Sequence, residues 1–430
     1  MITASHNPPE YNGYKVYWDN GGQIVPPIDQ QIIEEIKKIR KFEDIRKISL
    51  SDSRNKKIFS WIESESDQHY LNSVRTLSLG KRKHNKNLGI IFSPLHGTGG
   101  RLVPKLLQLQ GFSKVKVVEE QMKPDGNFST LVSPNPEDIS SFEMSKKIAS
   151  KEDELILVND PDADRLGVMV RDYNNSFQFL SGNQIGVLLL DYILAISKEN
   201  NLLPEKSAVI TTFVSSPLIK LIAKEYNLEV IEVLTGFKWI RQAALNFEKE
   251  SGGKFIFAME ESHGYLMGNH SGDKDGVWAA MAFAEMNAQL KYYDITPIEK
   301  LKMIYKKHGT YLDKLETQTI SGENSMREIT KIISSLRNTP PKSLGGETVI
   351  KITDLLNNRI TWLEKKEITS GPNLPSSNVI SFELKNGSII IVRPSGTEPK
   401  IKYYFNLRGN NIDDLKQMFL KIRESIINNN

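Results

Sequence analysis

The chain has 430 residues, and its 56 basic and 52 acidic side chains leave a formal net charge of +4. This near balance gives no general attraction for nucleic acid, so any anion recognition must be local. A cysteine count of 0 excludes disulfides, thiolate zinc sites and cysteine nucleophiles. No signal-peptide pattern opens the sequence, and its longest apolar run, residues 185–196, is too short to span a bilayer. We therefore expect a soluble cytoplasmic protein with no nucleic-acid or membrane partner.

The first segment, residues 1–80, carries a short motif close to its start. Ser5 offers a hydroxyl nucleophile and His6 an imidazole, and Pro8 keeps the motif out of a helix. A serine in such a place is ordinarily polar surface, so the motif needs support from other residues. Apart from an amphipathic stretch at 29–41, the segment shows little strand or helix pattern and is thin for a domain.

Two similar units follow, at residues 88–198 and 205–311, in which short β-rich apolar runs alternate with longer helical ones. In the first unit, strands are expected at 88–92, 115–118 and 155–158, and helices at 101–110, 139–149 and 184–196. In the second unit, strands are expected at 208–213, 229–234 and 255–259, and helices at 217–226, 237–247 and 275–290. Open parallel sheets bind ligands beyond the carboxyl ends of their strands, so the loops there should gather binding groups.

The last segment, residues 312–430, has a different pattern. Asn386 and Gly387 form a hairpin signal, and a helix is expected from Ile412. Strands are expected at 348–352, 379–384, 388–392 and 401–407. The predicted fold class is therefore α/β, with tandem mixed-sheet α/β domains followed by a C-terminal α+β domain.

Three carboxylates, Asp160, Asp162 and Asp164, follow the third strand of the first unit at alternate positions. They would repel one another unless a cation lay between them, and hard oxygen ligands favour Mg²⁺. An EF-hand is excluded, because Arg165 and Arg171 stand where that loop requires glycine and glutamate. A solvated acidic turn remains the alternative.

A loop at residues 393–400 joins two strands of the last segment and has the composition of an anion cradle. Arg393 supplies a planar fork for phosphate oxygens, and Gly396 allows backbone amides to turn inward. The hydroxyls of Ser395 and Thr397 and the ammonium of Lys400 add donors. An ordinary hairpin loop remains the alternative.

Glu260 and Ser262 close the third strand of the second unit, where a carboxylate and a hydroxyl suit sugar hydroxyls. Acidic loop residues are mostly solvated, so this signal is weak alone. Thr235, Gly236 and Lys238 indicate a helix-starting turn first and a ligand contact second.

Together these motifs resemble the α-D-phosphohexomutase family, and within it the bacterial phosphoglucomutase and phosphopentomutase branch. The four motifs occur in the family's order, and the stretches 235–238 and 273–276 also match family motifs. The resemblance implies a magnesium-dependent enzyme, a monomer or weak homodimer, that acts on small sugar phosphates. It implies four domains: a domain I remnant with the phosphoserine loop at 1–80, a metal-binding domain II at 88–198, a sugar-binding domain III at 205–311 and a phosphate-binding domain IV at 312–430.

The resemblance also implies roles for the individual residues. Ser5 would carry a phosphoryl group, with His6 beside it, Arg165 near the transferring phosphate and Lys15 as general acid/base with a depressed pKa. Mg²⁺ would bridge the phosphoserine to Asp160, Asp162 and Asp164. The non-reacting phosphate would be held by Arg393, Ser395, Gly396, Thr397 and Lys400, the sugar hydroxyls by Glu260 and Ser262, and further substrate contacts would come from Thr235, Gly236 and Lys238.

The implied reaction is the interconversion of glucose 1-phosphate and glucose 6-phosphate through a bisphosphorylated sugar. Mannose, pentose and amino-sugar phosphates remain alternatives. Family members carry a long segment before the serine motif that has no counterpart here, so a truncated, catalytically inactive sugar-phosphate-binding remnant is the second hypothesis. In that case residues 1–80 should be poorly protected, with a protease-resistant core beginning near Leu88.

Overall fold

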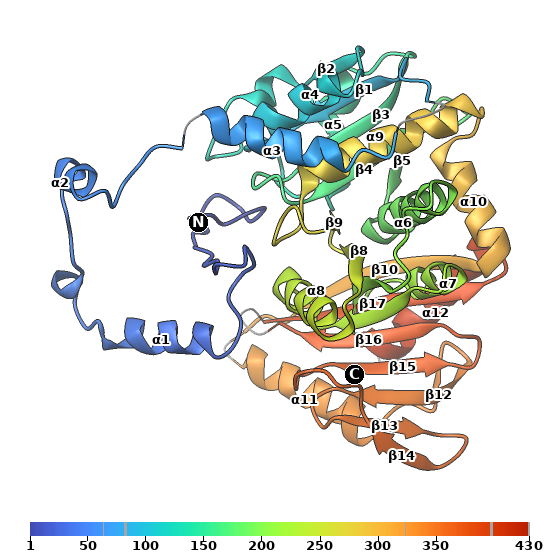
Figure 1. The fold of residues 1–430 in the computed structure, drawn as a ribbon. Coiled ribbons are helices and arrows are strands. Elements are labelled where there is room, and N and C mark those ends of the chain that lie inside the picture. The colour runs from blue at the N-terminus through green and yellow to red at the C-terminus, as the bar shows by residue number, and fades with distance from the viewer. Residues whose placement is uncertain (63, 81–83, 323, 396–398, 429–430) are drawn as a thin grey trace.

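The computed structural model describes residues 1–430 apart from 63, 81–83, 323, 396–398 and 429–430. The strands of the described residues form a five-stranded, a four-stranded and an eight-stranded sheet. Figure 1 shows these sheets in chain order from the top of the molecule to the bottom, with the first segment at one side. Two mixed α/β units followed by a domain built on an antiparallel sheet confirm the predicted fold class.

The first sheet has the strand order β2-β1-β3-β4-β5. Its strands are β1 (Gly89–Ser93), β2 (Val115–Val117), β3 (Asp153–Asn159), β4 (Leu166–Arg171) and β5 (Phe177–Leu180). The strands β1, β2 and β3 run parallel, whereas β4 and β5 are antiparallel additions that the sequence did not predict. Most of β4 is buried without an alternating pattern, and β5 has only four residues, so neither gave a clear strand signal.

The second sheet repeats this plan with the order β7-β6-β8-β9. Its strands are β6 (Ser207–Thr212), β7 (Glu229–Val233), β8 (Lys254–Glu260) and the antiparallel β9 (Gly264–Met267). The sequence predicted the first three and missed β9. In both units the antiparallel strand turns back directly after the acidic loop, so each loop is held between two paired strands.

Helices cover both sheets, and two of them pack across the units. The helices of this region are α4 (Gly99–Leu109), α5 (Glu143–Lys147), α6 (Gly182–Glu199), α7 (Leu218–Glu225), α8 (Phe237–Ser251), α9 (Gly276–Tyr292) and α10 (Pro297–His308). Helix α9 follows the second sheet but packs on α4, β3 and β4, whereas α6 follows the first sheet and packs on α7 and β8. One hydrophobic core therefore runs through both units. The single helix expected at 139–149 is wrong, because a 3₁₀ turn, η3 (Ile139–Phe142), precedes the short α5.

The last sheet is antiparallel, and β10 pairs with β17 along their full lengths. Its elements are β10 (Thr310–Thr319), α11 (Ser325–Asn338), β11 (Ser343–Leu344), β12 (Glu347–Asp354), β13 (Arg359–Trp362), β14 (Glu367–Ser370), β15 (Ile380–Leu384), β16 (Ile389–Pro394), β17 (Lys400–Gly409), α12 (Ile412–Arg423) and η4 (Glu424–Asn428). The predicted hairpin is present, with Gly387 at φ 85° and its N–H donating to the carbonyl of Leu384 at 2.9 Å.

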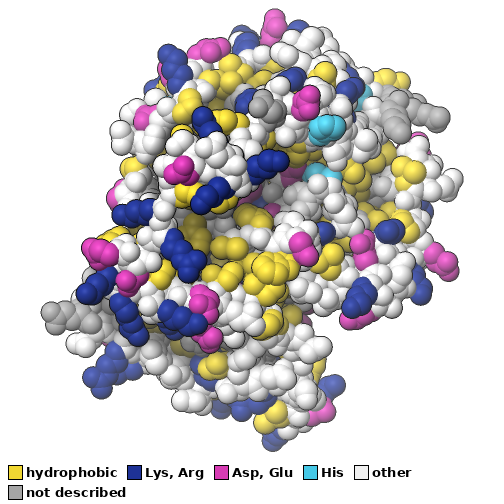
Figure 2. All heavy atoms as spheres, turned by 60° about the vertical axis from the view of Figure 1, so that its left-hand side comes forward, with side chains coloured by type: hydrophobic (Ala, Val, Ile, Leu, Met, Phe, Trp, Pro, Cys, Tyr) yellow, Lys and Arg dark blue, Asp and Glu magenta, His cyan; other side chains and the backbone are white. Residues whose placement is uncertain are grey.

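The first segment is sparsely packed until its last helix. It contains α1 (Ile28–Lys38), η1 (Phe42–Asp44), α2 (Leu50–Asn55) and α3 (Ser64–Thr76). Helix α1 has no buried residue. Figure 2 turns the left-hand side of Figure 1 toward the viewer, and this face of the molecule shows hydrophobic side chains exposed among basic ones. Leu71 and Val74 of α3, by contrast, are fully buried in the core that contains β1 and α4. Among the described residues, no helix has the length and apolar character needed to cross a membrane.

Candidate active site

Ser5 lies on a tight loop whose ends are joined by backbone pairing. The N–H of Thr3 donates to Gly13 at 3.0 Å, which brings Lys15 back beside the serine. Ser5 has φ 56°, an uncommon conformation for a residue with a side chain, and its N–H donates to Thr3 Oγ1 at 2.8 Å. The Ser5 hydroxyl donates to Asp160 Oδ2 at 3.1 Å. It also lies 3.2 Å from Nδ1 of the adjacent His6.

The loop at 160–165 is locked by its own backbone. Asp160 Oδ1 accepts the N–H groups of Asp164 at 3.1 Å and Arg165 at 3.0 Å. Gly276, the first residue of α9, donates its N–H to the carbonyl of Ala163 at 3.0 Å. A Cβ on Gly276 would lie 2.5 Å from the carbonyl oxygen of Arg165, so only glycine allows α9 to approach this closely. The fold therefore holds the acidic loop rigidly beside Ser5.

Two lysines neutralise the acidic loop. Lys15 Nζ lies 2.9 Å from Asp162 Oδ2 and 3.4 Å from Asp164 Oδ2, and Lys274 Nζ lies 3.3 Å from Asp164 Oδ2. Burial lowers the pKa of Lys15, but Asp164 and Asp162 outweigh burial and hold that pKa above its ordinary value. The expectation of a depressed Lys15 pKa is therefore wrong for this arrangement. Lys274 was not predicted as a site residue, although it lies within the 273–276 motif.

The donor set beside Ser5 has the chemistry that Mg²⁺ prefers. Asp164 Oδ1 is buried and has no hydrogen-bond partner among the described residues, and Asp160 Oδ2 faces the Ser5 hydroxyl. Burial, followed by the neighbouring Asp164, raises the pKa of Asp160. In the part of the chain that the structure describes, no three His, Asp or Glu side chains are arranged as a ready metal site. Asp164 can therefore offer Oδ1 to a cation while Oδ2 keeps Lys15, whereas the two oxygens of Asp162 already contact Thr3 Oγ1 and Lys15 Nζ.

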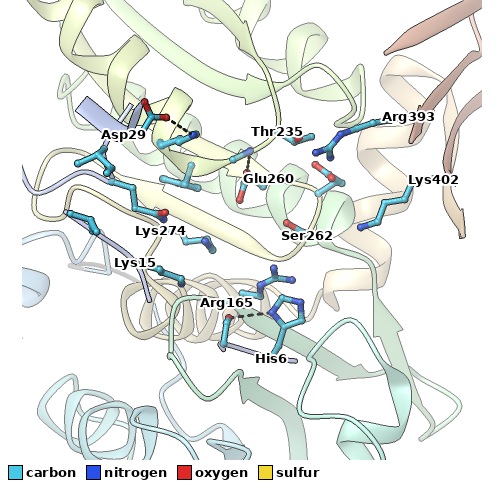
Figure 3. A pocket seen from close by; sticks show the side chains of 18 of the residues that line it. His6, Lys15, Asp29, Arg165, Thr235, Glu260, Ser262, Lys274, Arg393 and Lys402 are labelled. Carbon is cyan, nitrogen blue, oxygen red and sulfur yellow. Dashed lines mark hydrogen bonds and ion pairs between the residues drawn. The ribbon is translucent and has the colours of Figure 1, made fainter. Parts of the chain in front are cut away.

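The opposite wall is built around Glu260, which is 6% exposed at the end of β8. Glu260 Oε1 accepts the N–H of Gly236 at 2.7 Å, and Gly236 has φ 115°, which favours glycine. The loop that follows β8 and the turn at 235–238 are thus joined directly. Figure 3 shows Glu260 and Ser262 on the cavity wall, with Lys274 near Glu260. Lys238 Nζ lies 3.9 Å from Asp29 of α1, so the first segment reaches this wall.

The third wall belongs to the last sheet. Arg393 and Lys402 are direct neighbours across the β16–β17 pair, and Figure 3 shows both side chains extending toward the cavity. Like charges placed directly opposite in a sheet are unfavourable unless an anion lies near them. The N–H of Ser395 donates to the carbonyl of Lys400 at 2.8 Å and closes the base of the loop. The predicted ligands Gly396 and Thr397 lie outside the described residues.

These walls enclose a cleft of about 670 Å³. The predicted residues that line it are Ser5, His6, Lys15, Arg165, Thr235, Gly236, Lys238, Glu260, Ser262 and Arg393. The aspartates 160, 162 and 164 lie behind Ser5 rather than on the lining, and Ser395 and Lys400 are not among the lining residues. Sequence reasoning missed five charged lining residues, Asp29, Glu137, Glu261, Lys274 and Lys402. Such mixed charge around hydroxyl groups suits a ligand that carries both phosphate and hydroxyls.

Proteins of known family match this chain along most of its length. The family models described as phosphoglucomutase/phosphomannomutase alpha/beta/alpha domains I, II and III match residues 1–43, 68–174 and 181–307. A phosphoglucomutase from Staphylococcus aureus strain MSSA476 is 37% identical over 421 residues, which are 97% of this chain and 74% of that protein.

Two solved structures share the fold. The phosphoglucomutase parafusin from Paramecium matches with a TM-score of 0.65 and 18% identity, over 99% of this chain and 75% of that one. A phosphoglucomutase/phosphomannomutase family protein from Burkholderia thailandensis matches with a TM-score of 0.64 and 17% identity, over the same shares of 99% and 75%. The serine loop, the cations Arg393 and Lys402 and the acidic loop behind Ser5 lie around one cleft, and the relatives match nearly the whole chain. The chain therefore belongs to the α-D-phosphohexomutase family of intramolecular phosphotransferases.

Proposed function

We propose that this chain interconverts glucose 1-phosphate and glucose 6-phosphate through a phosphoserine at Ser5 and a bisphosphorylated sugar. The observation that carries the proposal is the position of the Ser5 hydroxyl. It shares one cleft with the sugar-binding candidates Glu260 and Ser262 and with the cations Arg393 and Lys402. A sugar that carries two phosphates can therefore present one to Ser5 and the other to the last sheet.

In the first transfer, the bond between phosphorus and the Ser5 oxygen breaks, and a bond between phosphorus and a sugar hydroxyl oxygen forms. Asp164 and Asp162 raise the pKa of Lys15, which suits Lys15 to give a proton to the departing Ser5 oxygen. The proton that the attacking sugar hydroxyl loses then returns to the Lys15 amine, so the transfer leaves the lysine protonated. Arg165 brings a second cation to the same side of the cleft. The second transfer reverses these roles after the bisphosphate has turned over.

Mg²⁺ is the proposed cofactor, held by Asp160, Asp162 and Asp164 with the oxygen of Ser5. When bound, it would supply charge stabilisation to the phosphoryl group during transfer. The non-reacting phosphate is assigned to Arg393 and the loop that follows it, with Lys402 as an added cation. Glu260 and Ser262 are assigned to the sugar hydroxyls, and the turn at 235–238 supports Glu260.

A coupled assay with glucose 1-phosphate, glucose 1,6-bisphosphate and Mg²⁺ tests the proposal. We expect turnover by the parent chain, none by Ser5→Ala, and normal turnover by Ser73→Ala, because Ser73 is exposed on α3 and is not a lining residue of the cleft. Mannose 1-phosphate and ribose 1-phosphate are compared by kcat/KM to decide the preferred sugar. No turnover on any hexose or pentose phosphate would refute the proposed activity.

A further inference from the structure

Glu137 stands on a loop that is held by its own hydrogen bonds. Its N–H donates to Asn135 Oδ1 at 3.1 Å. The hydroxyl of Ser141 donates to the carbonyls of Ser133 at 2.9 Å and Asn135 at 2.7 Å, which closes the loop from both sides. The position of the Glu137 backbone is therefore fixed.

A glycine of β4 lets this loop lie close to the acidic loop. A Cβ on Gly167 would lie 2.8 Å from both the Cβ and the carbonyl oxygen of Pro136. Only glycine permits that approach, because a Cβ at position 167 would clash with the backbone of Pro136. Pro136 precedes Glu137, and Gly167 lies near Arg165 at the start of β4, so this contact brings Glu137 within reach of Arg165.

The side chains of Glu137 and Arg165 form an ion pair in the floor of the cleft. Arg165 Nη1 donates to Glu137 Oε1 at 2.5 Å, and the two side chains are 13% and 29% exposed, Arg165 being the more buried. Arg165 Nε is buried and has no hydrogen-bond partner among the described residues. Glu137 is thus the carboxylate that fixes the orientation of this guanidinium.

Groups from three other elements also face Glu137. His6, His263 and Lys402 lie close enough to interact with its charge, and they come from the serine loop, the β8–β9 turn and β17. Figure 3 shows Arg165 directly beside His6, next to the dashed contact between His6 and Ser5. The ion pair between Glu137 and Arg165 therefore lies between the serine loop and the last sheet.

We propose that Glu137 is a positioning residue that holds the Arg165 guanidinium toward the phosphoryl group transferred at Ser5. The proposal rests on the proposed mutase function and adds a residue to it. An arginine side chain has many rotamers, and the ion pair removes this freedom before substrate binds. In this role Glu137 acts through its ion pair with Arg165.

A direct test observes the Arg165 guanidinium by NMR in the full chain labelled with ¹⁵N-arginine, with Arg165→Lys used for assignment. We expect slow rotation about the Arg165 guanidinium in the parent and fast rotation in Glu137→Gln, which keeps the shape and removes the charge. The matched control is Glu143→Gln, because Glu143 pairs with Lys146 on the exposed surface. Unchanged Arg165 signals in Glu137→Gln would overturn the proposal.

Kinetics provide the second readout. Misplacing a positioned group by about 1 Å costs roughly 100-fold in rate, so Glu137→Gln should lower kcat by roughly 10- to 100-fold. KM for the sugar phosphate should change by less than about 3-fold, because the phosphate and sugar loops are untouched. The double variant Glu137→Gln/Arg165→Lys should be no slower than Arg165→Lys alone. Independent, multiplying losses in the double variant would contradict the proposed coupling.

Failure of the proposed function and failure of the Glu137 proposal give different results. If the parent shows no turnover, the proposed function fails, and the NMR comparison alone decides whether Glu137 orders Arg165. If Glu137→Gln does not fold, Glu137→Asp replaces it, since the shorter carboxylate keeps the charge but withdraws from the guanidinium. Glu137→Asp should show intermediate rotation and an intermediate kcat, and parent-like values in both would overturn the proposal.

Discussion

Replacing Asp162 by asparagine tests the ion network behind Ser5. From the sequence alone, this change should stabilise the metal-free protein, because it removes one of three crowded carboxylates. The structure reverses that expectation. Asp162 accepts hydrogen bonds from Thr3 Oγ1 and from Lys15 Nζ, the latter at 2.9 Å, and the Lys15 and Asp162 side chains are only 21% and 7% exposed.

The size of the expected loss of stability follows from these contacts. A hydrogen bond between charged groups contributes about 1.5 to 3 kcal/mol to stability. Part of this contribution is retained in Asp162→Asn, because Lys15 Nζ still lies 3.4 Å from Asp164 Oδ2. The loss of one negative charge also relieves repulsion within the acidic loop, which offsets a further part of the lost stability. We therefore expect Asp162→Asn to lower the free energy of unfolding by about 1 kcal/mol in EDTA.

Urea unfolding followed by tryptophan fluorescence measures this change, because Trp278, one of the five tryptophans, is fully buried in α9 and becomes exposed on unfolding. Asp19→Asn is the control, since Asp19 is exposed in the same N-terminal segment. With Mg²⁺ at about 100 times its Kd, the parent should gain about 2.7 kcal/mol and Asp162→Asn clearly less. Equal or greater stability of Asp162→Asn in EDTA refutes the ion-network argument, and equal gains with Mg²⁺ refute the metal assignment.

Four further outcomes are expected. Gly276→Ala should lose about 1 to 3 kcal/mol of stability in urea, because its Cβ meets backbone oxygens, whereas Gly126→Ala should be neutral, since a Cβ there meets nothing within 4 Å. Burial raises the pKa of Glu261 from 4.5 to about 7, so the folded state holds a proton that the unfolded state releases, and stability should fall as pH rises through that window. Glu261→Gln should flatten this slope in urea titrations at several pH values. Lys402→Gln should raise KM for the sugar phosphate about 10-fold with kcat within about 2-fold, and an unchanged KM would remove Lys402 from the phosphate site. Limited proteolysis with mass spectrometry should cut first between α1 and α3, because α1 buries nothing, and the resistant fragment should begin near α3; equal protection of the whole chain would contradict this.

Local chemistry was predictable from the sequence, because motifs keep their residues together. Asp160 and Arg165 lie on the predicted loop after β3, and Glu260 closes β8 as expected. The parallel strands were also predictable, since their apolar runs are bounded by turns. The motifs around Ser5 and Arg393 were identified as parts of one site, and the structure brings both residues to the same cleft.

Contacts between distant segments were not predictable in the same way. The pKa of Lys15 depends on Asp162 and Asp164, and no pattern along the chain places an ammonium between them. Glu137 lies in a loop without periodicity, so only the fold reveals its pairing with Arg165. The proteolytic boundary predicted near Leu88 moves to α3, because its burial depends on α4 from the next unit.

The crossing of α6 and α9 between the two α/β units limits how this protein can be divided. A cut in the connection after α6 would remove α9 from the sheet formed by β3 and β4, and would leave α6 without α7 and β8. Each half would expose an apolar face that its own residues cannot cover. For recombination, in the laboratory or between genes, the smallest exchangeable piece is therefore the pair of units from α3 to α10, inherited as one block.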